Sequence, residues 1–314
     1  MDRRNAYRLL IAVAALATAA AVARTAALPL SEARWIAPGH DVARALTTEP
    51  RECLALPADP DARLAVEIGR AAFRDPLVLG GVAARVGLAC ASCHRAGHAN
   101  PDFHFPGLSG APGTADTTSA ITSERRDDGQ FNPRPIPSLV TDAGDETISR
   151  TRTGALEQFI HGLIVEEFDG PEPAPGLLAG LAAYVRALRS EACHGPGNGP
   201  IMVTDRINDI ARALDAGARA LALGDRASAR AMMSSARSML GALVERLPAP
   251  DLAPARVELR AMAIEIGRLQ AGPVSAADLT GLRRRLLGKQ AAASTWQTSS
   301  LFDAGTVETL LGHP

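Results

Sequence analysis

Cys90-Ala91-Ser92-Cys93-His94 is the most specific stretch of this 314-residue chain. Two residues separate the two thiols, and an imidazole follows the second thiol directly. This C-x-x-C-H pattern is typical of segments that attach haem c. The spacing suits that chemistry, because two thiols add to the two vinyl groups of one porphyrin edge and the adjoining imidazole then reaches the iron.

The same pattern could also arise from a redox dithiol, from half of a zinc site or by coincidence. A zinc site needs a second pair of ligands, and the chain has no second C-x-x-C. A redox dithiol usually lies beside a strand–helix unit, which the sequence does not indicate here. The predicted cofactor is therefore one covalently attached haem c. Its predicted binding residues are Cys90, Cys93 and His94, with His94 as the metal ligand.

The N-terminus predicts the compartment. Arg3, Arg4 and Arg8 precede an uncharged apolar run at residues 9–23, and small residues follow it. This layout is typical of a secretory signal peptide, which we expect over residues 1–27. The run is shorter than the roughly 20 apolar residues of a membrane-spanning helix. We therefore expect a periplasmic protein; if the segment is not cleaved, it would tether the protein to the membrane.

Composition excludes two classes of protein and suggests a division of the chain. A content of 46% hydrophobic and 21% charged residues excludes a mostly disordered chain. With 33 basic and 34 acidic residues, the chain lacks the basic excess of a nucleic-acid binder. Residues 30–199 carry a net charge of −7 and residues 200–314 a net charge of +3. A glycine- and proline-rich stretch at 195–200 predicts a boundary between a haem domain (40–195) and a helical domain (201–314).

Apolar spacing predicts helices in both parts. Residues 62–73, 153–165 and 177–188 have helical periods, whereas residues 94–139 read as a long loop. After the boundary, four apolar stripes predict an antiparallel helical bundle, with Thr204 opening its first helix and Ser275 forming a capping box with Asp278. The methionines at 232, 233 and 239 stand among alanines and leucines, so we expect them in the core rather than at a metal.

Three segments around the motif resemble one family. Residues 68–76, IGRAAFRDP, are similar to the L-G-R-x-x-F-x-D-P segment of bacterial cytochrome c peroxidases and their MauG-like relatives. Residues 134–139, RPIPSL, are similar to that family's R-x-x-P-S-L segment, and residues 177–188 resemble the last helix of a cytochrome c fold. The resemblance covers residues 65–190. It implies an all-α protein with a cytochrome c-like haem domain followed by the C-terminal antiparallel helical bundle.

The chain differs from that family in its number of haem motifs, and this difference affects the expected function. The family's peroxidases carry two C-x-x-C-H motifs, and this chain carries one. Transfer from one haem to a second therefore cannot run within the chain. We expect an exported monohaem c-type cytochrome that carries out one-electron transfer with a redox partner, either another cytochrome or a small electron carrier. The alternatives are a cytochrome c peroxidase-like enzyme that reduces hydrogen peroxide and a haem-based sensor with a helical output module.

The sequence leaves two points undecided, the sixth iron ligand and the state of the remaining two cysteines. No methionine lies between His94 and Met202, so a methionine ligand is disfavoured. Of the histidines at 98, 104 and 161, His104 is preferred because its proline-bounded loop could wrap to the distal side; an open position is the alternative. Cys53 and Cys193 are expected to form a disulfide in an oxidising compartment. Otherwise both stay free and buried, or Cys193 and its neighbour His194 bind a ligand.

Overall fold

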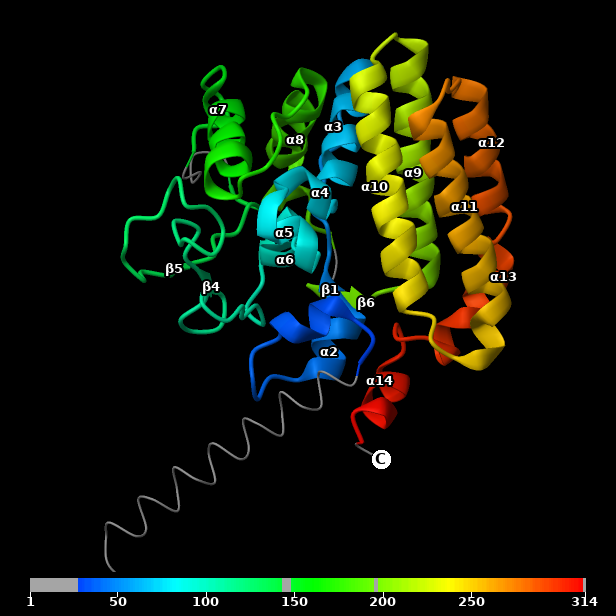
Figure 1. Cartoon of the computed structure of the whole chain (residues 1–314), viewed down its shortest axis with the longest axis horizontal. Coiled ribbons are helices and arrows are strands. Elements are labelled where there is room, and N and C mark those ends of the chain that lie inside the picture. Colours follow the sequence, from blue (N-terminus) through cyan, green and yellow to red (C-terminus); the bar gives the residue numbers. More distant parts are fainter. Residues whose placement is uncertain (1–27, 143–147, 195–196, 313–314) are drawn as a thin grey trace, which may run out of the picture.

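The computed structural model describes residues 28–142, 148–194 and 197–312. This part of the chain is mostly helical and has three short two-stranded sheets (Figure 1). The predicted helical character of the protein is confirmed to that extent. The predicted signal peptide, residues 1–27, lies outside the described residues. Within them, no helix combines the length and the apolar character needed to cross a membrane.

Short helices at the N-terminal end lead to one long helix and then to the C-x-x-C-H segment. The long helix, predicted at 62–73, is capped by Asp59, whose carboxylate accepts a hydrogen bond from the Ala62 amide at 2.8 Å. In chain order these elements are η1 (Ser31–Trp35), α2 (Val42–Thr47), β1 (Thr48–Pro50), α3 (Pro60–Ala72), α4 (Pro76–Leu79), α5 (Gly81–Val86) and α6 (Cys90–Cys93).

The segment after α6 is irregular, as predicted for residues 94–139, apart from two small hairpins. The later helices match the predictions at 153–165 and 177–188, although the first of them ends in a π-helical turn. These elements are β2 (His94–Arg95) paired with β3 (His98–Ala99), β4 (Thr114–Ala115) paired with β5 (Arg134–Pro135), α7 (Ala155–Gly162), η2 (Leu163–Glu167), α8 (Pro175–Ala187), η3 (Ser190–Ala192) and β6 (Asn198–Pro200).

Four long helices dominate the C-terminal end. α9 packs against α10 and α12, and α10 packs against α11 (Figure 1). Most residues of the apolar stripes are buried as predicted. Met232 and Met233 lie in the core, whereas Met239 is only partly buried against it. The elements are α9 (Val203–Ala222), α10 (Arg226–Glu245), η4 (Pro250–Leu252), α11 (Ala253–Ala271), α12 (Ala276–Leu287), α13 (Gln290–Trp296), η5 (Gln297–Ser299) and α14 (Ala304–Leu310). Below, α9–α14 are called the C-terminal helices, and residues 28–200 the motif region.

One of the two predicted caps in the C-terminal helices is confirmed and one is wrong. Ser275 and Asp278 form the reciprocal capping box at the start of α12. Thr204, however, lies inside α9, which begins at Val203. A distant side chain replaces the expected local cap, because the Val203 amide donates to Gln297 Oε1 at 2.9 Å.

The helices α3 and α8 cross at two glycines. A Cβ atom added to Gly69 would stand 1.9 Å from the Gly180 carbonyl oxygen. Only glycine therefore permits this approach of the two backbones. The contact joins the helix before the C-x-x-C-H segment to the last helix of the motif region.

The hydrophobic core continues from the motif region into the C-terminal helices. One cluster of buried side chains runs from Leu64 on α3 to Phe302 near the C-terminus. The predicted boundary at 195–200 is partly a strand, since β6 pairs antiparallel with β1. The buried carboxylate of Asp75 adds a polar link, because it accepts hydrogen bonds from the Ser235 and Ser238 hydroxyls of α10 at 3.2 and 2.8 Å.

Candidate haem-attachment site

The two motif cysteines lie on α6, a single helical turn held at both ends. The amide of Ala89, just before the turn, donates to Ser92 Oγ at 3.1 Å. The amide of Ala91 donates to the Phe73 carbonyl at 3.0 Å, which fixes α6 to the end of α3. Both cysteines are half-buried free thiols that pack against the hydrophobic core. The turn therefore presents two thiols from one rigid support.

Both thiols are protonated in the protein without a bound group. Burial raises the pKa of Cys90 to about 12. Burial and the neighbouring Cys90 likewise raise the pKa of Cys93 to about 12. Redox dithiol chemistry requires a thiolate with a lowered pKa, so the raised pKa values of Cys90 and Cys93 disfavour that function.

The imidazole of His94 is held through one of its nitrogens. Its Nδ1 lies 3.0 Å from the Pro137 carbonyl oxygen. A carbonyl oxygen only accepts, so Nδ1 carries the proton and Nε2 is left with its lone pair. Burial lowers the pKa of His94 to about 4 and outweighs the opposing effect of the Pro137 bond, so the ring is neutral at pH 7. A neutral imidazole fixed through its second nitrogen is the usual form of a metal-ligating histidine.

The surroundings of the motif are apolar. The Phe73 ring lies 6.4 Å from the His94 ring, measured between centroids. Half-buried hydrophobic side chains between residues 105 and 160 pack against the same extended core as Cys90 and Cys93; they include Phe105, Ala115, Leu139, Val140, Ile148 and Ile160. The donor set of two thiols and one neutral imidazole, with apolar neighbours, fits a covalently bound haem.

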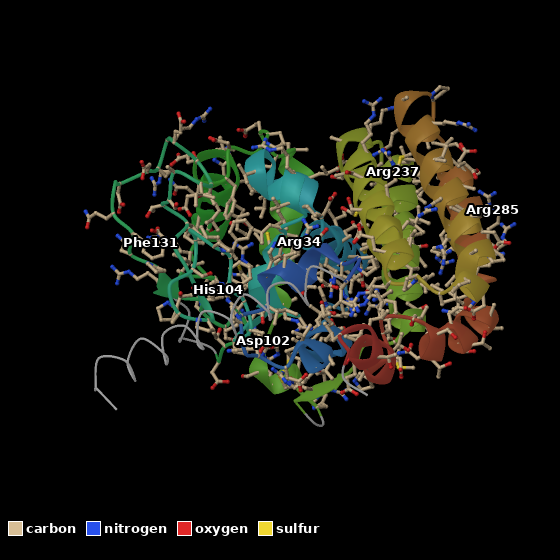
Figure 2. All side chains as sticks on the ribbon, turned by 60° about the horizontal axis from the view of Figure 1, so that its bottom comes forward. Arg34, Asp102, His104, Phe131, Arg237 and Arg285 are labelled. Atoms are coloured by element: carbon tan, nitrogen blue, oxygen red, sulfur yellow. A yellow bond between two sulfur atoms is a disulfide. The ribbon has the colours of Figure 1, made fainter. Side chains whose placement is uncertain are left out.

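The three candidate histidines for a sixth ligand have different environments. His98 Nε2 lies 3.0 Å from the Arg51 carbonyl oxygen, so this nitrogen is protonated. His161 Nε2 lies 2.9 Å from a carboxylate oxygen of Glu172. The half-buried His104 makes no side-chain hydrogen bond within the described residues, and its amide donates to the Trp35 carbonyl at 2.7 Å. In Figure 2 it lies in the loop region, away from α10 and α12. His104 as a ligand stays a prediction.

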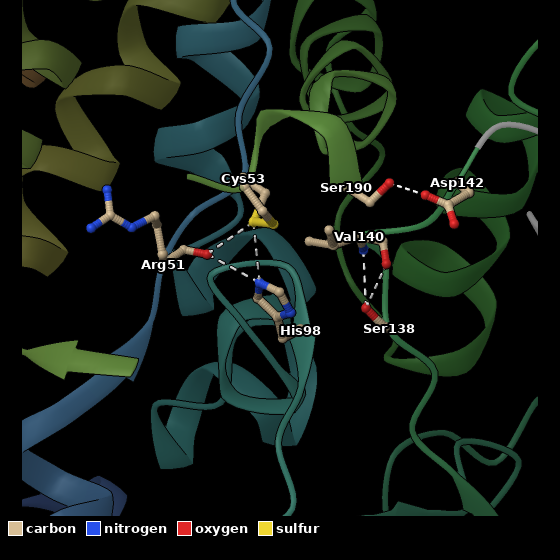
Figure 3. The surroundings of a disulfide bond; sticks show 8 residues. Arg51, Cys53, His98, Ser138, Val140, Asp142 and Ser190 are labelled. Atoms are coloured by element: carbon tan, nitrogen blue, oxygen red, sulfur yellow. Dashed lines mark hydrogen bonds between the residues drawn. A yellow bond between two sulfur atoms is a disulfide. The ribbon is translucent and has the colours of Figure 1, made fainter. Parts of the chain in front are cut away.

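Cys53 and Cys193 form a disulfide, as the sequence predicts (Figure 3). Their Cα atoms are 4.6 Å apart, and 140 positions separate them in the chain. His98 Nε2 lies 3.7 Å from Cys53 Sγ. The two sulfurs and this nitrogen form a cluster of the kind that binds metals. As a disulfide, however, the sulfurs are not thiolates, and His98 Nε2 carries the proton that it donates to the Arg51 carbonyl, so the cluster lacks the free ligand atoms of a metal site.

A buried charged cluster that the sequence does not predict lies behind the motif. The Glu52 carboxylate pairs with Arg70 of α3 and with Arg74 just after that helix, and it accepts a hydrogen bond from the Tyr184 hydroxyl at 2.7 Å. The Tyr184 ring lies 5.0 Å from the Phe73 ring. Two arginines four residues apart, one in the last turn of α3 and one just after the helix, were the available signal, but their acidic partner precedes the helix and could not be read from that spacing.

The pKa of Glu52 reflects this cluster. Burial alone would raise that pKa, but the charges of Arg74 and Arg70 and the Tyr184 hydrogen bond together lower it to about 2. The same burial raises the pKa of Tyr184 well above its usual value, and the neighbouring Glu52 charge acts in the same direction. The phenol is therefore neutral and donates its proton to an ionised carboxylate.

No protein-family model, curated protein or solved structure matches the chain. A functional interpretation therefore depends on the residues of the site and their geometry.

Proposed function

We propose that the chain is an exported monohaem c-type cytochrome that carries out one-electron transfer. In this proposal a cytochrome c-like haem domain precedes an antiparallel helical bundle. The single observation that carries it is the arrangement at Cys90, Cys93 and His94. Two protonated thiols stand on one helical turn, and the following imidazole is oriented by Pro137 with Nε2 unprotonated.

Each residue of the motif has a distinct task. The sulfurs of Cys90 and Cys93 would form the two thioether bonds, and His94 Nε2 would ligate the iron. When bound, the haem supplies a reversible one-electron couple. The Pro137 carbonyl holds the His94 ring in one orientation, and the Phe73 ring lies beside it. The Glu52 cluster holds α3 in place against α8 through Tyr184.

The contacts of the resembling segments support kinship with cytochrome c peroxidases and their MauG-like relatives. Phe73, in the first segment, accepts a hydrogen bond from α6 through its carbonyl oxygen. Pro137, in the second segment, orients His94. Leu139, also in the second segment, donates its amide to the Gly97 carbonyl at 2.7 Å. Segments that are 58 or more positions apart in the sequence thus contact the same motif.

Export and a protein partner complete the proposal. Residues 1–27 would direct the chain to the periplasm, and the Cys53–Cys193 disulfide is the form expected in an oxidising compartment. The net charge of −7 over residues 30–199 suits a basic partner, such as another cytochrome. Electrostatic attraction of this kind raises the association rate and is weakened by salt.

A peroxidase-like enzyme is the second candidate, and the lack of an evident sixth ligand favours it. The sequence has no methionine between His94 and Met202, which lies at the start of α9 and is 37% exposed. An iron without a sixth protein ligand could bind peroxide. A haem-based sensor, with the C-terminal helices as its output, would also require a ligand-accessible iron.

A visible spectrum distinguishes these functions. The reduced-minus-oxidised spectrum of the purified holoprotein is recorded before and after carbon monoxide is added. We expect a low-spin c-type spectrum that carbon monoxide leaves unchanged. Prompt binding of carbon monoxide would instead support the enzyme or the sensor. A protein without covalent haem would contradict all three.

Stopped-flow kinetics then test the reaction itself. Oxidation of the reduced protein by a basic cytochrome should be fast at low ionic strength and slower at high ionic strength. Turnover of peroxide with small artificial donors should be weak, since the chain has one haem motif and few aromatic residues to hold a second oxidising equivalent. Rapid and sustained peroxide reduction would contradict the electron-transfer proposal.

A further inference from the structure

A cavity of about 480 Å³ lies between the motif region and the C-terminal helices. Its walls come from η1, α2, the segment around α6, and α10, and Phe302 closes one side. Cys90, Cys93 and His94 do not line it, although Ala91 and Arg95 do. The three proposed haem-binding residues are therefore not part of its wall. Its volume is within the roughly 300–1,000 Å³ of typical small-molecule sites.

The acidic side chains inside the cavity are already paired. Glu32 pairs with Arg246, and Glu49 pairs with Arg206. Asp102, labelled in Figure 2, accepts from Arg44 at 2.8 Å and contacts His40 at 2.9 Å, and Asp209 pairs with Arg206 and Arg212. Glu245, at the rim, has no ion-pair partner among the described residues, but it is exposed to water.

Arg95 is the exception among the cations of the cavity wall. Its guanidinium donates one hydrogen bond, to the Thr48 carbonyl oxygen. Within the described part of the chain no carboxylate forms an ion pair with it, whereas Arg74, Arg206 and Arg246 each have one. A guanidinium has five N–H donors in a planar fork, so most of those of Arg95 lack a protein acceptor. Arg95 is also half-buried, which makes an unpaired charge unfavourable there.

Apart from its charged residues and the polar Ser31, Ser92, Asn100 and Ser238, the wall is apolar and partly aromatic. Trp35, Met239, Leu243 and Phe302 contribute large side chains, and Ala84 contributes a small one. A ligand that fills this space must therefore combine an apolar body with one anionic group.

We propose that the cavity binds a small organic carboxylate, with its carboxylate on Arg95 and its apolar body against Trp35 and Leu243. Arginine and carboxylate match as two parallel N–H···O bonds, which are stronger than neutral hydrogen bonds. A singly charged acid is favoured over a phosphate because the one unpaired guanidinium balances one negative charge, while Arg74, Arg206 and Arg246 already pair with carboxylates.

Isothermal titration calorimetry of the purified protein tests this proposal with hexanoate and benzoate as probes. Hexanamide and benzamide serve as uncharged counterparts of the same shape. Inorganic phosphate is titrated in a separate experiment. We expect at least one acid to bind about tenfold more tightly than its amide, the factor expected for one charge-assisted contact. Equal affinities of acid and amide, tighter binding of phosphate, or no binding of either acid would overturn the proposal.

Two variants locate the binding. Arg95→Met keeps the length of the side chain and should weaken the acid about tenfold while leaving the amide unchanged. Arg230→Met on α10 removes an exposed arginine that does not line the cavity and is the matched control. Ala242→Phe enlarges a side chain of the cavity wall and should weaken acid and amide alike. Unchanged acid binding by both Arg95→Met and Ala242→Phe would place the ligand elsewhere and contradict the proposal.

Discussion

In the motif region, polar and covalent links join residues far apart in the chain, whereas the C-terminal helices pack along apolar stripes that recur at helical spacing. The first pattern includes the Cys53–Cys193 disulfide, the Glu52 cluster and the backbone contact at Gly69. The second includes the buried residues of α9, α10, α11 and α12. The difference indicates that the motif region depends on a few links, while the stability of the C-terminal helices is spread over many contacts.

Removing the disulfide should have the largest effect. The double variant Cys53→Ser, Cys193→Ser should lose about 4 kcal/mol of unfolding free energy, because the bridge closes a loop of 140 positions. Chemical denaturation followed by far-UV circular dichroism of the holoprotein measures the loss. Wild-type protein treated with dithiothreitol should match the variant, and the variant should not respond to the reductant. A loss below about 1 kcal/mol would show that the motif region does not depend on this link.

The glycine crossing should give the next largest effect. Gly69→Ala should destabilise the protein by about 3 kcal/mol, since the new Cβ would meet the Gly180 carbonyl oxygen at 1.9 Å. Gly281→Ala on α12 is the matched control, because nothing lies within 4 Å of its Cβ position. That control should stabilise the protein by about 0.5 to 1 kcal/mol. If Gly69→Ala and Gly281→Ala changed the unfolding free energy by similar amounts, the motif region would not depend on its glycine crossing more than the C-terminal helices depend on a single residue.

The Glu52 cluster predicts a loss of stability in acid. The pKa of Glu52 is lowered from 4.5 to about 2 in the folded protein, so its contribution is fully present above pH 4.5. It is lost as the pH falls toward 2 and amounts to about 3 kcal/mol at most. Denaturation series between pH 6 and pH 2 measure it. Glu52→Gln should be less stable at pH 6 and show a shallower loss in acid; an unchanged slope would contradict this role.

The smallest predicted effect concerns one cap in the C-terminal helices. Ser275→Ala should cost about 1 kcal/mol, because it removes the hydroxyl that accepts from the Asp278 amide. Ser275→Asp keeps an acceptor and should recover most of the loss. If Ser275→Ala were as damaging as the loss of the disulfide, the stability of this region would not be spread over many contacts.

The sequence predicts local features better than long-range ones. Three of the sequence patterns each lie within a few residues: the helical stripes, the Ser275 cap and the C-x-x-C-H spacing. The structure confirms the helical stripes and the Ser275 cap. Thr204 was the wrong cap because Gln297, 94 positions from Val203, satisfies the first amide of α9. Tertiary packing alone brings Glu52 and Tyr184 to their partners. It also leaves Arg95 without an ion-pair partner. No spacing rule identifies such residues.

Covalent haem is the central claim, and extraction of the purified protein tests it most directly. The chain is produced with its N-terminal segment in a bacterium that attaches haem c, then treated with acid acetone and stained for haem after denaturing electrophoresis. We predict that the protein band keeps its haem colour, that its intact mass exceeds that of the polypeptide by one haem, and that Cys90→Ala with Cys93→Ala loses both signals. Haem that extracts freely from the wild-type protein, or a protein band without haem, would contradict the claim.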